Sequence, residues 1–171
     1  MSALQAIQVL IVDDNQHMRA IASAILQSAG IRKIREVSDG AAALEALREA
    51  PVDIAIVDFN MFPLDGVEFT RLVRNSPDSP NPYLPIIMMT GHSEKHRVME
   101  ARDSGVTEFV VKPITAKAVF DRIQACIIRP RSFVKTDGYF GPDRRRSANP
   151  SYKGPMRRAT DAQSTSGASA A

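Results

Sequence analysis

The heptapeptide QVLIVDD at residues 8–14 places a run of aliphatic residues directly before two aspartates. An uninterrupted run of this kind is typical of a strand that helices cover on both faces of a parallel sheet. Residues 52–57 repeat the pattern and run into Asp58, and two further apolar stretches end at Thr90 and Lys112. The sequence therefore predicts buried strands with polar side chains at their carboxyl ends.

Helical patterns separate these strands. Residues 17–29 carry apolar side chains at the i, i+3, i+4, i+7 spacing of an amphipathic helix and are followed by Gly30. Ser38 or Asp39 can cap a second helix over residues 40–49. The remaining predicted helices cover residues 67–74, 94–104 and 115–127, and the remaining strands cover residues 34–37, 85–89 and 108–111. This alternation predicts a doubly wound, five-stranded parallel sheet in an α/β domain.

Composition narrows the class of protein. The 171 residues are 44% hydrophobic and 24% charged, which is typical of a folded domain and excludes wholly disordered and fibrous chains. No apolar stretch reaches the roughly 18 to 20 residues that span a bilayer. The N-terminus lacks a signal-peptide pattern, and Cys126 has no cysteine partner for an internal disulfide. These features predict a cytoplasmic protein without a membrane segment.

Charge divides the chain into a domain and a tail. Residues 129–171 contain nine Lys and Arg against three Asp and Glu, whereas residues 1–128 carry a balance of −3. The basic part is rich in Gly, Pro, Arg, Ser and Ala, so we expect one domain over residues 1–128 and a poorly structured tail over residues 129–171. The tail is too short and polar for a helix-turn-helix domain, which argues against sequence-specific DNA binding.

The tail contains a repeat. The segment YFGPDRR at residues 139–145 recurs as YKGPMRR at residues 152–158. Three interpretations stay open: a solvated tail, a segment that Phe133 and the tyrosines anchor on the acidic domain, or a docking peptide for an acidic partner or RNA.

The side chains at the strand ends suggest the chemistry, because doubly wound sheets form their sites beyond the carboxyl ends of the strands. Asp13 and Asp14, Asp58, Thr90 and Lys112 are predicted to meet there. Crowded carboxylates favour a divalent cation with oxygen ligands, so we expect Mg²⁺. Such a site suits phosphoryl transfer, with Asp58 as nucleophile, Thr90 as hydrogen-bond donor and Lys112 neutralising charge.

In this order, the motifs resemble the response-regulator receiver domain of bacterial two-component signalling, over about residues 6–128. They are Val12-Asp13-Asp14-Asn15, Val57-Asp58-Phe59-Asn60-Met61, Thr90-Gly91 and Val111-Lys112-Pro113. The resemblance implies the flavodoxin-like strand order 2-1-3-4-5. It also implies that Asp58 becomes an aspartyl phosphate, with a sensor histidine kinase or a histidine phosphotransfer protein as donor.

The resemblance also implies roles for single residues. Asp14 would ligate Mg²⁺ directly with Asp13 alongside it, and Asp58 and the backbone carbonyl of Asn60 would complete the protein ligands.

Lys112 would contact the phosphoryl oxygen and would precede a cis peptide bond to Pro113. Thr90 and Phe109 would switch together on phosphorylation. One departure from the family pattern is Phe62, which separates Met61 from a proline that usually follows the methionine directly.

We interpret the chain as a stand-alone response regulator that signals by contact with an unknown downstream protein, as a monomer or a phosphorylation-dependent dimer. It would be no enzyme beyond its own phosphorylation and dephosphorylation. The alternative is a phosphorelay intermediate or phosphate sink without its own effector. An independent phosphatase would need a dedicated base and a substrate pocket, for which the sequence offers no candidates.

Overall fold

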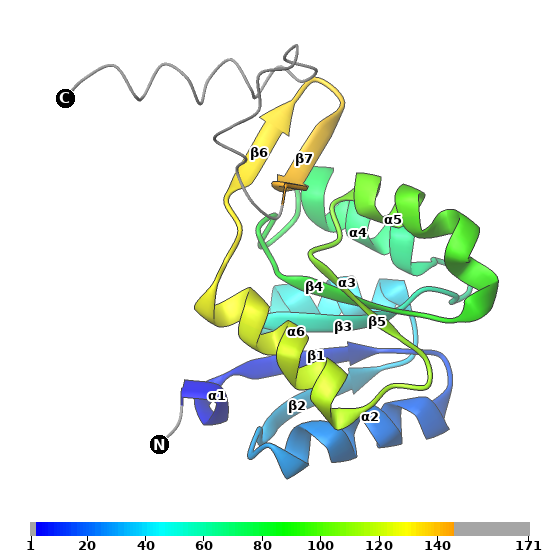
Figure 1. Cartoon of the computed structure of the whole chain (residues 1–171). Coiled ribbons are helices and arrows are strands. Elements are labelled where there is room, and N and C mark those ends of the chain that lie inside the picture. Colours follow the sequence, from blue (N-terminus) through cyan, green and yellow to red (C-terminus); the bar gives the residue numbers. More distant parts are fainter. Residues whose placement is uncertain (1–2, 146–171) are drawn as a thin grey trace, which may run out of the picture.

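Five parallel strands form the centre of the computed structural model, which describes residues 3–145 (Figure 1). They follow the order β2-β1-β3-β4-β5 across the sheet. Their bounds are β1 (Gln8–Val12), β2 (Lys33–Val37), β3 (Ile54–Asp58), β4 (Ile86–Thr90) and β5 (Glu108–Val111). The predicted doubly wound sheet and its strand order are confirmed.

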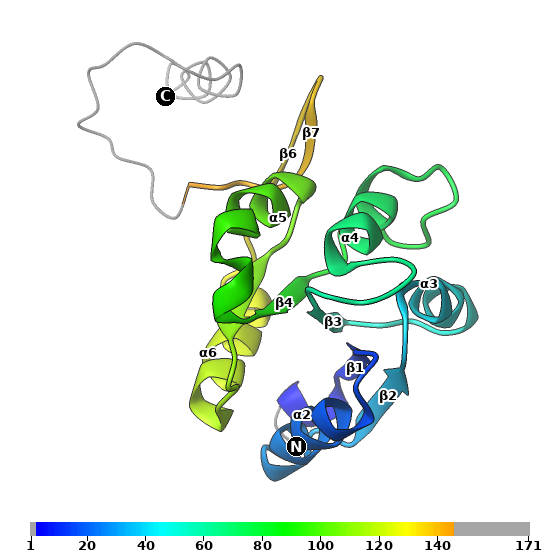
Figure 2. The same cartoon turned by 90° about the vertical axis from the view of Figure 1, so that its right-hand side faces the viewer.

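Helices cover both faces of this sheet (Figure 2). One face packs against α2 (Gln16–Ser28) and α6 (Ala116–Ile128), and the other packs against α3 (Gly40–Glu49), α4 (Gly66–Asn75) and α5 (Val98–Ser104). Two shorter elements are α1 (Ala3–Ala6) and the 3₁₀ helix η1 (His92–Arg97). Within residues 3–145, no helix has the length and apolar character needed to cross a membrane.

Successive residues of β1 supply the two cores in turn. Val9 and Ile11 pack with α2 and α6, whereas Leu10 and Val12 pack with α3 and α4. All four side chains are at most 1% exposed. Burying an aliphatic side chain of this size contributes about 1.5–3 kcal/mol, so both faces of the strand must be apolar. Polar residues stand only at its two ends, where Gln8 begins the strand and Asp13 follows it.

Side-chain caps mark where helices begin. Asn15 accepts hydrogen bonds from two backbone N–H groups at the start of α2, and Asp39 accepts one at the start of α3. Of the two capping residues predicted for α3, the structure therefore uses Asp39. The predicted continuous helix over residues 94–104 is instead η1 followed by α5, and Gly91, the residue before η1, offers no side-chain acceptor.

Residues 133–142 form an antiparallel hairpin, which corrects the prediction of a poorly structured tail for this segment. β6 (Phe133–Thr136) pairs with β7 (Tyr139–Pro142), and β7 contacts α4 and α5 (Figure 1). The rings of Phe133 and Phe140 lie 5.0 and 5.4 Å from the ring of Tyr83. The composition of the tail did not predict this packing because the third aromatic ring belongs to the domain.

Ion pairs also fasten the hairpin segment to the domain. Arg144 pairs with Asp103 on α5, and Arg131 pairs with Glu108 on β5 at 2.6 Å. Phe133 and, in the first copy of the repeat, Arg144 contact the domain as the anchored interpretation expects, whereas the Tyr139 hydroxyl donates to Pro142 within the hairpin. The second copy, residues 152–158, lies outside the described residues.

The hairpin covers a buried cation, Arg74, at the end of α4. Its guanidinium donates to the carbonyl oxygens of Gly105 at 3.0 Å and Pro82 at 2.8 Å and lies 5.0 Å from the ring centroid of Phe133. Burial lowers the pKa of Arg74 to about 10, which still leaves the group charged at neutral pH. The carbonyl oxygens and the ring therefore compensate the loss of water around this charge.

Two glycines of the hairpin allow a matched test of its docking. A Cβ at Gly141 would lie 2.9 Å from the Cα of Gly105 and 2.6 Å from the Tyr139 hydroxyl, whereas a Cβ at Gly138 would meet nothing within 4 Å. We expect Gly141→Ala to lower the free energy of unfolding by about 1–3 kcal/mol. Gly138→Ala should change it by less than about 0.5 kcal/mol. Thermal unfolding of both variants measures the difference, and equal midpoints would contradict the docked arrangement.

Candidate functional site

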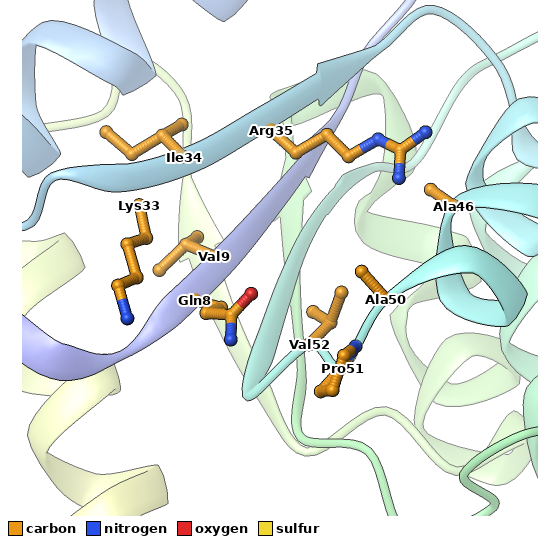
Figure 3. Close-up of a pocket in the computed structure, with 9 residues that line it drawn as sticks. All are labelled: Gln8, Val9, Lys33, Ile34, Arg35, Ala46, Ala50, Pro51 and Val52. Carbon is orange, nitrogen blue, oxygen red and sulfur yellow. The ribbon is translucent and has the colours of Figure 1, made fainter.

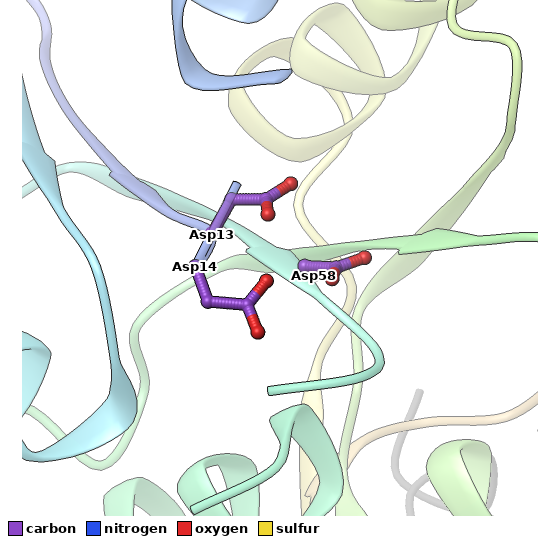
Figure 4. Close-up of side chains that lie close together, drawn as sticks. All are labelled: Asp13, Asp14 and Asp58. Atoms are coloured by element: carbon purple, nitrogen blue, oxygen red, sulfur yellow. The ribbon is translucent and has the colours of Figure 1, made fainter. Parts of the chain in front are cut away.

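Four charged side chains lie at the carboxyl edge of the sheet, because each ends or follows a parallel strand. Asp13 and Asp14 follow β1, Asp58 ends β3 and Lys112 follows β5. Carboxylate oxygens of the three aspartates lie within 4.8 Å of one another. Figure 4 shows the three side chains beside each other at the ends of β1 and β3. The structure thus brings together four of the residues that the sequence analysis selected.

Asp13 is fully buried, but only one of its two carboxylate oxygens accepts a hydrogen bond from the described residues. Its Oδ1 accepts a hydrogen bond from the backbone N–H of Asn15 at 2.9 Å, while its Oδ2 is buried without a hydrogen-bond partner among the described residues. Burial raises the pKa of Asp13, and the Asn15 hydrogen bond and Lys112 oppose that rise. A buried carboxylate oxygen without a donor is unfavourable unless a cation or a proton reaches it.

Asp58 is 5% exposed and pairs with Lys112, whose Nζ lies 2.5 Å from its Oδ1. Burial raises the pKa of Asp58 to about 6, against the lowering effect of the Lys112 hydrogen bond and with a smaller contribution from the charge of Asp13. One ammonium group therefore does not balance three neighbouring carboxylates.

These residues fit a divalent cation. The donor set is made of carboxylate oxygens, which hard cations such as Mg²⁺ prefer, and the buried Oδ2 of Asp13 lacks a partner. Asp14 is exposed, so it can supply an oxygen from the solvent side of the cluster while water completes the coordination. The cluster of Asp13, Asp14 and Asp58 can therefore hold a metal ion.

The other predicted residues surround this cluster. Thr90 ends β4 and is 4% exposed, and in the sheet it lies beside Val111, the residue before Lys112. Phe109 on β5 is half-buried and packs against the small core formed partly by α5. Asn60 is exposed, two residues after Asp58. Thr90 and Phe109 lie on the strands that the sequence analysis predicted.

The loop between β3 and α4 has an unusual apolar residue. Phe62 is 84% exposed, and its peptide bond to Pro63 is cis. The peptide bond between Lys112 and Pro113 is also cis, as the resemblance implies. The departure from the family pattern at Phe62 therefore places a large aromatic ring in solvent, four residues after Asp58.

Sequence reasoning missed one charged residue close to the site. Glu94 is 7% exposed and accepts hydrogen bonds from the side chain of Asn60 and from the backbone N–H of Gly91. A glutamate three residues after a helix-capping position is a recognised signal, but Gly91 is a weak cap and the contact with Asn60 joins distant parts of the sequence. Only the folded structure brings these three residues together.

A separate pocket lies at the opposite edge of the sheet, where β1 and β2 begin (Figure 3). Its lining is largely aliphatic, with polar groups from Gln8, Lys33 and Arg35. Arg35 pairs with Glu49 on α3. The pocket holds no carboxylate in its lining and does not share residues with the acidic cluster.

Comparison with known proteins agrees with this geometry. The family model for the response regulator receiver domain matches residues 9–124, which is more than half of the chain. The chain belongs to the response-regulator receiver family. As a receiver domain, it carries its acidic cluster within the matched residues, whereas the hairpin of β6 and β7 lies beyond them.

Relatives of this receiver domain include chemotaxis proteins. It is 34% identical to the chemotaxis protein CheY of Pseudomonas aeruginosa over 117 residues, which is 68% of this chain and 93% of that protein. The structure of Vibrio cholerae CheY4 matches with a TM-score of 0.62 and 32% identity, covering 69% of this chain and 96% of that one.

A third match is the receiver domain of a sensor histidine kinase from Pseudomonas aeruginosa. Its structure has a TM-score of 0.61 and 25% identity, covering 68% of this chain and 93% of that one. That domain was solved with a magnesium ion coordinated in its active-site cleft.

The raised pKa of Asp58 predicts how Mg²⁺ stabilises the receiver domain at different pH. Its carboxyl has a pKa of about 6 in the fold against a usual 3.8, so the metal-free fold binds a proton that the unfolded chain releases. Stability of the metal-free protein therefore falls as pH rises through this window, by about 2–3 kcal/mol. Mg²⁺ binds the ionised carboxylates, so its stabilising effect should grow over the same window.

Thermal unfolding with Mg²⁺ or with EDTA, at about pH 5 and about pH 7.5, measures this effect. We expect a larger Mg²⁺-induced rise in the unfolding midpoint at the higher pH, and Asp58→Asn should reduce the difference between the two conditions. If Mg²⁺ raised the unfolding midpoint equally at both pH values, or did not raise it, the expectation that Mg²⁺ binds the ionised carboxylates would be contradicted.

Proposed function

We propose that the chain is a response regulator whose Asp58 accepts a phosphoryl group from a phosphohistidine of a sensor kinase or a histidine phosphotransfer protein. The observation that carries the proposal is the position of Asp58. It is buried beside two further carboxylates, yet its Oδ1 lies 2.5 Å from the Lys112 ammonium. A nucleophile and a cation for the developing negative charge therefore lie in contact.

The transfer can be written with these groups. An oxygen of the Asp58 carboxylate forms the new P–O bond while the P–N bond of the phosphohistidine breaks, and the imidazole nitrogen keeps the electron pair of that bond. Lys112 is placed to neutralise charge on the phosphoryl oxygens. Thr90, at the end of the strand between β3 and β5, is the candidate hydroxyl donor to the phosphoryl group. Water later attacks the phosphorus and releases phosphate.

We assign the metal to Asp13, Asp14 and Asp58, with the backbone carbonyl of Asn60 as a further ligand. The unpartnered Oδ2 of Asp13 supports this assignment, as does the magnesium ion in the similar receiver domain from Pseudomonas aeruginosa. Mg²⁺ bound there would supply positive charge for the phosphoryl oxygens. It would also relieve the repulsion among the carboxylates before any phosphoryl donor arrives.

We infer that the output is a protein contact through α5, β5 and α6. Phosphorylation adds about −1.5 to −2 charges next to Lys112 and Thr90. Phe109 is half-buried on β5, so its ring has room to become more buried when the neighbouring strand end changes. The partner is a downstream protein, and the chain acts on no substrate besides its own phosphoryl group. A cytoplasmic location stays a prediction.

Intact mass after incubation with phosphoramidate and Mg²⁺ tests the proposal. We expect the mass of one phosphoryl group on the wild type and none on Asp58→Asn, because the acyl phosphate needs that carboxylate. Asp121→Asn is the matched control, since Asp121 is exposed on α6 and pairs only with a neighbouring lysine in the same helix among its recorded contacts. EDTA should abolish the gain.

A gain that survives in Asp58→Asn would contradict the assignment of the phosphoacceptor. A second measurement follows the phosphate after it is bound. Release to water supports a terminal response regulator, whereas transfer to a histidine phosphotransfer protein would make the chain a relay intermediate.

A further inference from the structure

Glu94 joins two loops that border the phosphoacceptor. Its Oε1 accepts a hydrogen bond from the side-chain amide of Asn60, in the loop after β3, and its Oε2 accepts one from the backbone N–H of Gly91, directly after β4, at 2.7 Å. Asn60 follows Asp58 by two residues, and Gly91 follows Thr90 by one. One buried carboxylate thus holds donors that belong to both sides of the site.

The hydrogen bonds of Asn60 and Gly91 to Glu94 have a carboxylate as their acceptor. Glu94 is 7% exposed, and a buried carboxylate needs donors to compensate for lost water. Hydrogen bonds to a charged acceptor are about twice as strong as those between neutral groups. Gly91 offers no side chain to accept the first N–H groups of η1, so Glu94 also serves as the cap of its own helix. Its side-chain position is therefore well defined.

A second side chain of η1 reaches the same loop. Arg97, three residues after Glu94, lies 4.9 Å from the ring centroid of Phe59 and 3.4 Å from the carboxylate of Asp65. Both ends of the loop between β3 and α4 are therefore in contact with η1. Contacts of η1 therefore hold the loop that follows the phosphoacceptor against the segment that follows Thr90.

We propose that Glu94 is a positioning residue that opposes phosphorylation by holding Asn60 and Gly91 in the unphosphorylated arrangement. This inference rests on the proposed function of Asp58. The phosphoryl group brings about −1.5 to −2 charges and three acceptor oxygens close to these donors, and it meets a carboxylate that is already negative. Repulsion and competition for the two donors both favour the unphosphorylated state as long as Glu94 keeps its charge and its contacts.

Phosphorylation rates with phosphoramidate and Mg²⁺ test this role in the full chain. Glu94→Gln removes the charge and replaces one acceptor oxygen by a donor, so we expect Asp58 to be phosphorylated about tenfold faster. The matched control is Glu45→Gln, which removes an exposed carboxylate on α3 whose recorded ion pair is with Arg48 of the same helix. That control should keep the wild-type rate.

The combination with Asn60→Ala separates positioning from a general effect on the fold. This substitution leaves the backbone carbonyl in place but removes the amide that Glu94 holds. In that background, we expect Glu94→Gln to change the rate by less than about threefold, because coupled residues are not additive. An unchanged tenfold effect would overturn the proposal, as would equal rates for Glu94→Gln and Glu45→Gln.

Thermal unfolding and the phosphorylation of the wild type distinguish a failure of this inference from a failure of the proposed function. Thermal unfolding shows whether Glu94→Gln is folded. If it is not, Glu94→Asp replaces it: the shorter side chain keeps the charge but cannot reach both donors, so a smaller acceleration, from the lost contacts alone, is expected. A wild type that takes no phosphate would refute the proposed function. A phosphorylated wild type with no difference among the variants would refute the role of Glu94 alone.

Discussion

The ion pair between Lys112 and Asp58 joins the ends of two strands that β4 separates in the sheet. It forms because parallel strands deliver their final residues to one edge, where Asp13 and Asp14 already lie. The single ammonium leaves the edge with excess negative charge and with a buried, unpartnered oxygen on Asp13. The crowded carboxylates repel one another and so disfavour folding. The same carboxylates provide oxygen ligands for a metal ion and a nucleophile for a phosphoryl group.

The order of strands and helices could be predicted largely because β1, β3 and β4 are short aliphatic runs, which are typical of strands buried on both faces of a parallel sheet. The site residues followed from the same reasoning, since Asp58 and Lys112 each stand where an apolar run stops. Sequence reasoning failed for contacts made between distant segments. The ring of Tyr83 packs against Phe133 of the hairpin, and the side chain of Asn60 donates a hydrogen bond to Glu94. Neither contact can be predicted from local sequence patterns.

The segment from η1 to α5 connects the two parts of the molecule that local patterns did not predict. At its beginning, Glu94 contacts the loop of the phosphoacceptor. At its end, Asp103 pairs with Arg144 of the tail, and Gly105 lies against the hairpin. Residues 133–142 of the tail thus form a hairpin that packs against α4 and α5.

We propose that Asp13, Asp14 and Asp58 form a metal site, because Lys112 alone cannot balance their charge. A crystal structure grown with Mn²⁺ in place of Mg²⁺ tests it directly, because the anomalous signal of manganese locates the ion independently of the protein atoms. We expect one strong peak among the three carboxylates, within contact of the Oδ2 of Asp13 or the neighbouring oxygens. A structure with no peak at this edge, and with the carboxylates balanced by Lys112 and protons alone, would contradict it.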